Sequence, residues 1–163
     1  MRILGIDPGL ANTGWGVIDA INQRYRPVSY GTITTKTSQK KEDRIFTIAS
    51  KVGELAVTHN VEIVSIEDIF FSQNVTSAIT VAKVIGAIIQ QIQLLNLEIV
   101  VFTPLQIKMA VTGFGKADKK QVQEMVKLLL KLDKIPKPDH AADSLAVAIC
   151  LAALSQSYKL KIH

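Results

Sequence analysis

The sequence predicts an α/β fold in which one mixed β-sheet, a three-stranded meander followed by parallel strands, has helices on both faces. Three short apolar runs bounded by Gly, Pro or Asn open the chain. Segments with apolar residues at helical spacing then alternate with further short apolar runs, which makes the later strands parallel and covers both faces of the sheet. The length of 163 residues suits a single domain spanning residues 1–163.

The predicted elements follow the order βββαβαβααα. The strands of the meander are Ile3–Asp7, Gly14–Asp19 and Tyr25–Thr34, each too short for a stable helix. Apolar residues three and four positions apart then predict a helix over 42–59. After it we expect a strand over 62–70, a helix over 75–95, a strand over 98–104, and helices over 104–111, 117–132 and 139–155.

Positive charge is concentrated in one segment of the chain. The net charge is +5, and eight lysines lie between Pro104 and Pro138. This local excess favours a polyanionic partner such as nucleic acid. A solvated lysine-rich face that serves solubility is the alternative that this pattern leaves open.

The cysteine content and the apolar segments indicate where the protein works. Cys150, the single cysteine, lies in an apolar helical pattern, so we expect an inert core thiol in a reducing compartment. The N-terminal apolar run is broken by Asp7 before any cleavage-like site. The apolar segment 75–95 is interrupted by Lys83 and three glutamines, which argues against a membrane span. We therefore expect a cytoplasmic protein with no membrane partner.

Two carboxylates end strands that are expected to be neighbours in the sheet. Asp7 closes the first strand, and Glu67 follows the apolar run of the fourth. Asp7 precedes Pro8 and Gly9, so a role in turn formation alone is one interpretation. Two carboxylates on adjacent strands, however, repel each other and raise each other's pKa unless a cation lies between them. Hard oxygen ligands favour Mg²⁺ or Mn²⁺.

A second pair of candidate ligands lies at the start of the last predicted helix, where Asp139 is the expected N-cap. His140 and Asp143 are three residues apart, so both project from one face of the first turn. An exposed pair interacting with the helix dipole is the simpler interpretation. The small residues that follow allow close packing on the sheet, which would bring both side chains to the strand ends. With Asp7 and Glu67 they would suit two divalent ions and phosphodiester hydrolysis.

Four blocks of this sequence resemble, in order, the signature regions of the RuvC family of Holliday-junction resolvases. They are LGIDPG with TGWGVI, IEDIFF, TPLQIKMAVTGFGKADKKQVQEMV and DHAADSLAVAI, and they cover nearly the whole chain. The resemblance implies a ribonuclease-H-like fold and a crossover junction endodeoxyribonuclease of DNA recombination and repair. It also implies a homodimer that nicks two strands of like polarity at a four-way DNA junction, together with a branch-migration helicase complex as partner.

The resemblance further implies roles for individual residues. Asp7, Glu67, His140 and Asp143 match the metal-binding catalytic set, which is expected to hold two Mg²⁺ ions per subunit, with Mn²⁺ able to substitute. Family members carry aspartate or histidine at the position of His140, and the softer imidazole favours Mn²⁺.

The same resemblance implies contacts with DNA. Lys108 and Lys119 match lysines that contact phosphates near the scissile bond, and Lys116 and Lys120 flank Lys119. Phe70 resembles an aromatic residue that stacks on an unpaired base, whereas core packing is the expected fate of at least one of Phe70 and Phe71.

Three other classes of protein share part of this pattern. Sugar kinases and actin-like ATPases begin with a similar strand, but the sequence shows neither their second phosphate-binding hairpin nor their adenosine motif. The YqgF-like group of ribosomal RNA maturation lacks the D-H-A-A-D helix. A catalytically dead junction-binding module would have lost a carboxylate, whereas all four ligand positions are filled here.

Overall fold

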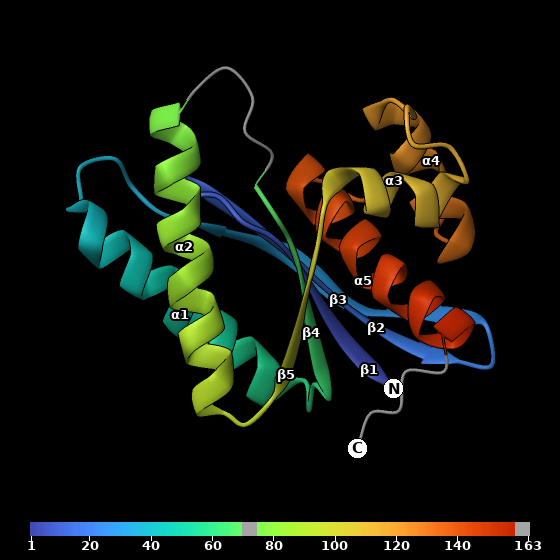
Figure 1. Cartoon of the computed structure of the whole chain (residues 1–163), viewed down its shortest axis with the longest axis horizontal. Coiled ribbons are helices and arrows are strands. Elements are labelled where there is room, and N and C mark those ends of the chain that lie inside the picture. The colour runs from blue at the N-terminus through green and yellow to red at the C-terminus, as the bar shows by residue number, and fades with distance from the viewer. Residues whose placement is uncertain (70–74, 159–163) are drawn as a thin grey trace.

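The computed structural model describes residues 1–69 and 75–158, which form a five-stranded sheet covered by helices (Figure 1). The strand order is β3-β2-β1-β4-β5. Antiparallel pairing joins β1 to β2 and β2 to β3, and β4 pairs parallel with both β1 and β5. The predicted mixed sheet is therefore confirmed. The strands are β1 (Arg2–Asp7), β2 (Asn12–Ile21), β3 (Arg24–Thr34), β4 (Ile63–Glu67) and β5 (Glu98–Phe102).

Helices cover both faces of the sheet, in the predicted chain order. Figure 1 shows α1 and α2 on one side and α3, α4 and α5 on the other. α4 begins two residues later than predicted because the Asp118 carboxylate accepts a hydrogen bond from the Gln121 backbone and caps the helix. The helices are α1 (Lys41–Thr58), α2 (Val75–Leu94), α3 (Pro104–Thr112), α4 (Lys119–Leu129) and α5 (Asp139–Tyr158).

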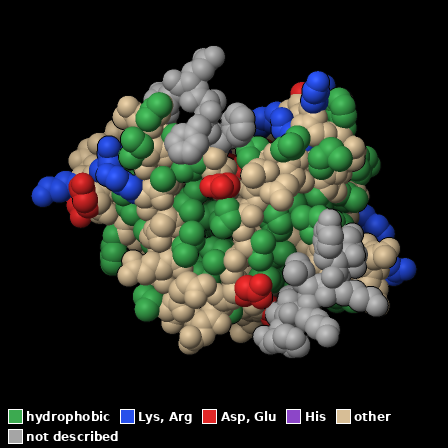
Figure 2. Space-filling model, in the orientation of Figure 1, with side chains coloured by type: hydrophobic (Ala, Val, Ile, Leu, Met, Phe, Trp, Pro, Cys, Tyr) green, Lys and Arg blue, Asp and Glu red, His purple; other side chains and the backbone are tan. Residues whose placement is uncertain are grey.

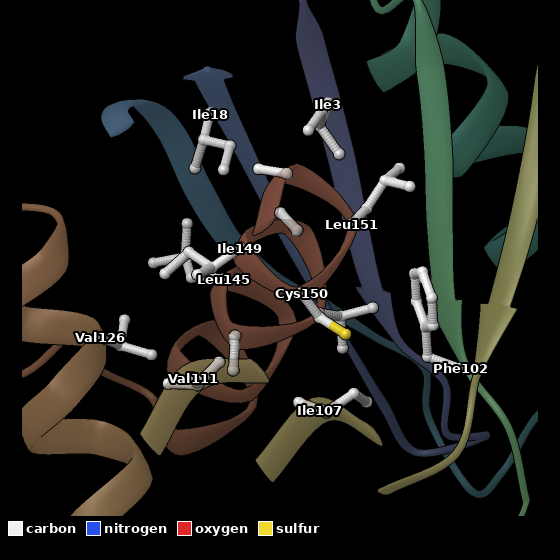
Figure 3. Close-up of a cluster of buried hydrophobic side chains, with 14 of the residues drawn as sticks. Ile3, Ile18, Phe102, Ile107, Val111, Val126, Leu145, Ile149, Cys150 and Leu151 are labelled. Carbon is white, nitrogen blue, oxygen red and sulfur yellow. The ribbon is translucent and has the colours of Figure 1, made fainter. Parts of the chain in front are cut away.

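The larger of the two core clusters is centred on α5 (Figure 3). Every side chain from Leu145 to Ala152 is at most 1% exposed. This burial on all sides of the helix agrees with its run of small and apolar residues. Cys150 lies within this cluster, and its burial raises the pKa of the thiol to about 12, so the predicted inert core cysteine is confirmed.

Two glycines set how closely α5 approaches the sheet. A Cβ added at Gly5 of β1 would lie 2.6 Å from the Ala148 backbone nitrogen, and one at Gly14 of β2 would lie 2.5 Å from the His140 carbonyl carbon. Real Cβ atoms essentially never come so close to backbone atoms. The missing side chains therefore let the N-terminal half of α5 rest directly on the sheet.

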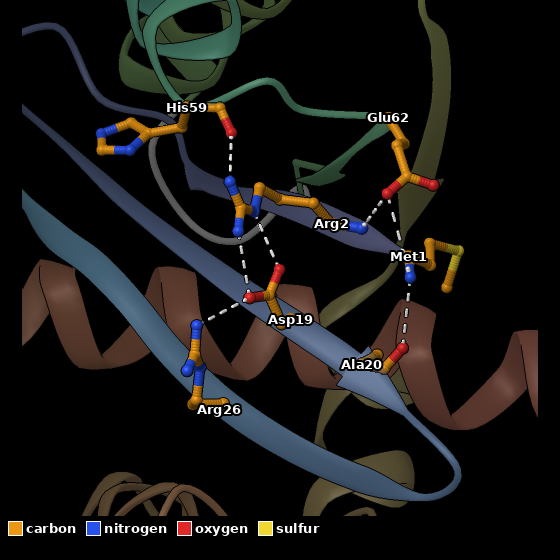
Figure 4. A network of polar contacts seen from close by, with 7 residues as sticks. All are labelled: Met1, Arg2, Asp19, Ala20, Arg26, His59 and Glu62. Atoms are coloured by element: carbon orange, nitrogen blue, oxygen red, sulfur yellow. Dashed lines mark hydrogen bonds and ion pairs between the residues drawn. The ribbon is translucent and has the colours of Figure 1, made fainter.

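A polar network joins the N-terminal end of β1 to β2 and to the segment before β4 (Figure 4). The Arg2 guanidinium donates to both carboxylate oxygens of Asp19, at 2.8 and 3.1 Å, and to the His59 carbonyl. The backbone N–H of Arg2 donates to Glu62. Bidentate pairs of this kind are among the stronger charge-assisted contacts, so they hold the register of the β1–β2 pair and fix the segment before β4.

The surface of α2 is unusually apolar for an exposed helix. Among the described residues α2 is the one helix whose length and composition could span a membrane, which is weak evidence because core helices pass the same test. Its buried residues, among them Ile85, Ile88 and Ile92, pack into the second core cluster as those of a core helix do. In Figure 2, hydrophobic side chains run through the middle of the face on which α2 lies.

Candidate active site

Asp7 and Glu67 lie at the same edge of the sheet because they end neighbouring parallel strands. Ile6 of β1 pairs with Ile66 of β4, so the next residue of each strand is one of the two carboxylates. Both side chains are only partly exposed. The expectation that these carboxylates are neighbours is therefore met in the structure.

The first turn of α5 brings His140 and Asp143 to this edge. His140 Nδ1 lies 2.8 Å from Asp7 Oδ2. One ligand atom each from Asp7, His140 and Asp143 lies within 4.8 Å of the others. Glu67 stands outside this close group but is near enough for its charge to interact with both Asp7 and Asp143.

The turn interpretation of Asp7 does not fit the observed contacts. The Asp7 carboxylate pairs with His140, on an element more than a hundred residues away. The following turn is held by Thr13, whose hydroxyl donates to the Gly9 carbonyl at 2.6 Å and accepts from the Gly9 N–H at 3.3 Å. The side chain of Asp7 is thus directed into the site.

Burial makes this group of carboxylates electrostatically unfavourable. Burial, followed by the charges of Asp7 and Asp143, raises the pKa of Glu67 to about 7. Burial also raises the pKa of Asp7, and Asp143 adds to this, whereas the hydrogen bond from His140 opposes it. Partly buried carboxylates that repel one another are stabilised by a cation between them. The donor set of carboxylate oxygens and one imidazole nitrogen therefore fits a divalent metal ion.

Two of the predicted lysines lie at this site. Lys119, the first residue of α4, has its ammonium 3.0 Å from Asp143 Oδ2. Lys108 of α3 lowers the pKa of Glu67 through its charge. Both lysines, with Glu67 and Asp143, line a hollow of about 190 Å³. The hollow offers positive charge directly beside the carboxylates.

The other residues predicted to contact DNA lie elsewhere. Lys116 is exposed in the loop between α3 and α4 and does not line this hollow. Lys120 borders a separate apolar groove with Phe114 and Met125. Phe70 and Phe71 fall outside the described residues.

Asp139 does not have the role that the sequence predicts for it. Asp139 was the expected N-cap of the last helix, but it is the first residue of α5. Its carboxylate oxygens lie 2.8 Å from the Lys137 ammonium and 3.5 Å from that of Lys119. The lysine-rich segment before Asp139 was the only hint in the sequence of such contacts.

The sequence matches a known family over almost its full length. The profile described as crossover junction endodeoxyribonuclease RuvC matches residues 3–151. The chain belongs to the RuvC family. RuvC of Caldanaerobacter subterraneus subsp. tengcongensis is 45% identical over 150 residues, covering 92% of this chain and 91% of the relative. RuvC of Alkaliphilus oremlandii is 43% identical over 164 residues, covering 99% of this chain and all of the relative.

Solved structures of RuvC proteins share the fold. Thermus thermophilus RuvC superimposes with a TM-score of 0.90 at 29% identity, over 96% of each chain. The same protein in complex with a Holliday junction substrate gives a TM-score of 0.88 at 27% identity, over 97% of this chain and 96% of that one. The expected ribonuclease-H-like α/β fold of the RuvC family is therefore confirmed, and RuvC membership excludes the kinase-like and YqgF-like alternatives.

Proposed function

We propose that this chain is a single-domain endonuclease that resolves four-way DNA junctions by hydrolysing phosphodiester bonds with divalent metal ions. The observation that carries the proposal is the meeting of Asp7, His140 and Asp143 within 4.8 Å, with Lys119 alongside. Membership of the RuvC family supports the substrate, as does the T. thermophilus relative, which was solved with a Holliday junction.

Asp7, Glu67, Asp143 and His140 would hold the metal. When bound, two divalent ions polarise the phosphodiester and lower the pKa of an attacking water. The three carboxylates favour Mg²⁺, and the His140 imidazole leaves room for Mn²⁺. Asp7 orients the His140 ring through its contact with Nδ1.

Lys119 and Lys108 would hold the scissile phosphate beside the carboxylates. Both line the same hollow as Glu67 and Asp143, so a phosphate drawn to the ammonium groups would lie at the metal ligands. Positive charge at this place also stabilises the charge that develops on phosphate oxygens in the transition state. The more distant Lys116 and Lys120 would contact the DNA backbone further from the cut, and Phe70 would stack on an unpaired base.

The exposed apolar surface of α2 supports a homodimer. Val75, Ile79 and Leu94 are 62%, 50% and 70% exposed, and Val101 of the adjacent edge strand is 39% exposed. Symmetric cleavage of a junction needs two sites related by a two-fold axis, which an isologous dimer through this face would supply. Cytoplasmic action beside a branch-migration helicase complex follows from the resemblance to the family.

The decisive experiment offers a synthetic mobile four-way junction and a linear duplex of equal length to the protein with Mg²⁺. The protein should cut the junction and leave the duplex intact, and it should sediment as a dimer at micromolar concentration. Asp7→Asn should bind the junction in a mobility-shift assay without cutting it, because the lysines still meet the phosphates. Asp133→Asn, at an exposed acid outside the site, is the matched control. Normal cleavage by Asp7→Asn would refute the assigned role.

A further inference from the structure

Lys119 lies between two carboxylates of one helix. Its ammonium is 3.0 Å from Asp143 Oδ2 and 3.5 Å from Asp139 Oδ2. Asp139 and Asp143 are four residues apart, so they share one face of the first turn of α5. The other oxygen of Asp139 lies 2.8 Å from the Lys137 ammonium. The four side chains thus form a row of alternating charge along the start of α5.

The two carboxylates differ in their relation to the metal. Asp143 belongs to the close group with Asp7 and His140, whereas Asp139 does not. A divalent cation bound by Asp143 would compete with the Lys119 ammonium for the same carboxylate and repel it. The Lys119 side chain is 52% exposed, so little packing would keep it in place. Asp139 is then the acidic partner that remains for Lys119.

We propose that Asp139 is a positioning residue that keeps the Lys119 ammonium beside the reacting phosphate once metal occupies the site. The inference rests on the proposed function, in which Lys119 acts at the scissile phosphate. Asp139 holds Lys119 by an ion pair, and the Lys137 contact fixes the orientation of the Asp139 carboxylate. Asp139 itself touches neither metal nor DNA in this role.

A purely structural role of Asp139 predicts different behaviour. An acidic residue in the first turn stabilises a helix through the helix dipole, and its loss would lower the free energy of unfolding. The loss of a negative charge near DNA also reduces repulsion of the junction, which would tighten binding. A positioning role instead lowers the cleavage rate, so binding and rate should change in opposite directions.

The test compares Asp139→Asn with the parent in single-turnover cleavage at saturating junction with Mg²⁺. We expect the rate to fall roughly threefold to fivefold, the upper range for a partly exposed ion pair. Junction affinity measured in metal-free buffer should be equal or tighter, and the urea midpoint should stay near that of the parent. Asp139→Glu should restore most of the rate. Asp133→Asn removes an equal charge at an exposed position and should cleave like the parent.

A double-mutant cycle with Lys119→Met tests whether Asp139 acts through Lys119. If Asp139 acts through Lys119, Asp139→Asn should not slow the Lys119→Met enzyme further.

Two results would overturn the inference. These are a parent-like cleavage rate in Asp139→Asn and an equal loss of rate from Asp139→Asn when Lys119 is already methionine. Each of them presupposes a parent that cleaves junctions. A parent that leaves the junction uncut would instead refute the proposed function itself.

Discussion

The substitution Gly14→Ala tests how the sheet positions α5, which carries two of the proposed metal ligands. The added Cβ would lie 2.5 Å from the His140 carbonyl carbon, whereas ordinary contacts begin at 3.4 Å. The His140 carbonyl oxygen would be closer still. The first turn of α5 must therefore retreat by at least about 1 Å, and the obstacle is backbone, which cannot rotate away. Because His140 and Asp143 both lie in this turn, the retreat separates them from Asp7.

The substitution should lower both the stability of the protein and its cleavage rate. Overpacking of this kind costs about 3 kcal/mol, the upper end of the usual range, because a helix must move as a unit. For a protein of this length that corresponds to a melting temperature lower by roughly 6–12 °C. A misplacement of about 1 Å at a catalytic site costs on the order of 100-fold in rate. Gly14→Ala should therefore lose far more activity than its stability alone explains.

The assay measures single-turnover junction cleavage at a temperature where urea titration shows the variant to be folded. Gly31→Ala on β3 is the matched control, because the nearest atoms that its Cβ would meet belong to the Trp15 side chain, at 3.0 Å, and not to backbone. That variant should cleave like the parent. Cleavage by Gly14→Ala within threefold of the parent would show that α5 does not depend on this close contact.

Three further predictions concern pH and metal. The pKa of Glu67 is raised from an ordinary 4.5 to about 7. The metal-free protein should therefore lose up to roughly 3 kcal/mol of stability as pH rises through this range, and Mg²⁺ or Glu67→Gln should remove the loss in urea titrations. The hydrogen bond from Arg2 lowers the pKa of Asp19, so Asp19→Asn should be less stable than the parent near neutral pH. The two should converge as the pH falls below the ordinary carboxyl range, and parallel curves would refute this. Imidazole ligates a metal only when it is neutral, whereas a carboxylate stays ionised to much lower pH, so His140→Asp should outperform the parent in mildly acidic Mg²⁺ buffer. His140→Ala should lose most activity, with Mn²⁺ restoring more than Mg²⁺, and parent-like cleavage would reduce the site to three carboxylates.

Local patterns were sufficient to predict the elements and the edge of the sheet that carries the site. Asp7 and Glu67 could be placed together because parallel strands end at one edge of a sheet. Helix ends were less certain, since α4 begins after the Asp118 cap rather than at the first residue of its apolar pattern. The fourth strand also ends earlier than predicted: it stops at Glu67, where its parallel pairing with β5 ends.

The sequence could not predict which side chains pair with each other at the site. Asp139 has the residue type and position of a helix cap, yet its carboxylate lies against Lys119 and Lys137. This contact depends on how α4 and α5 pack together, which no local pattern encodes. The direction of Lys120, away from the hollow that Lys119 lines, depends on the same packing.

The position of α5 in the chain has a consequence for synthesis in the cell. The proposed metal ligands come from β1, β4 and the start of α5, and α5 also fills the centre of the larger core cluster. A growing chain on the ribosome therefore holds Asp7 and Glu67 long before it holds His140 and Asp143. We expect no nuclease activity from any partly made chain, since the centre forms only when α5 packs onto the finished sheet. We therefore expect unfinished copies to leave DNA uncut.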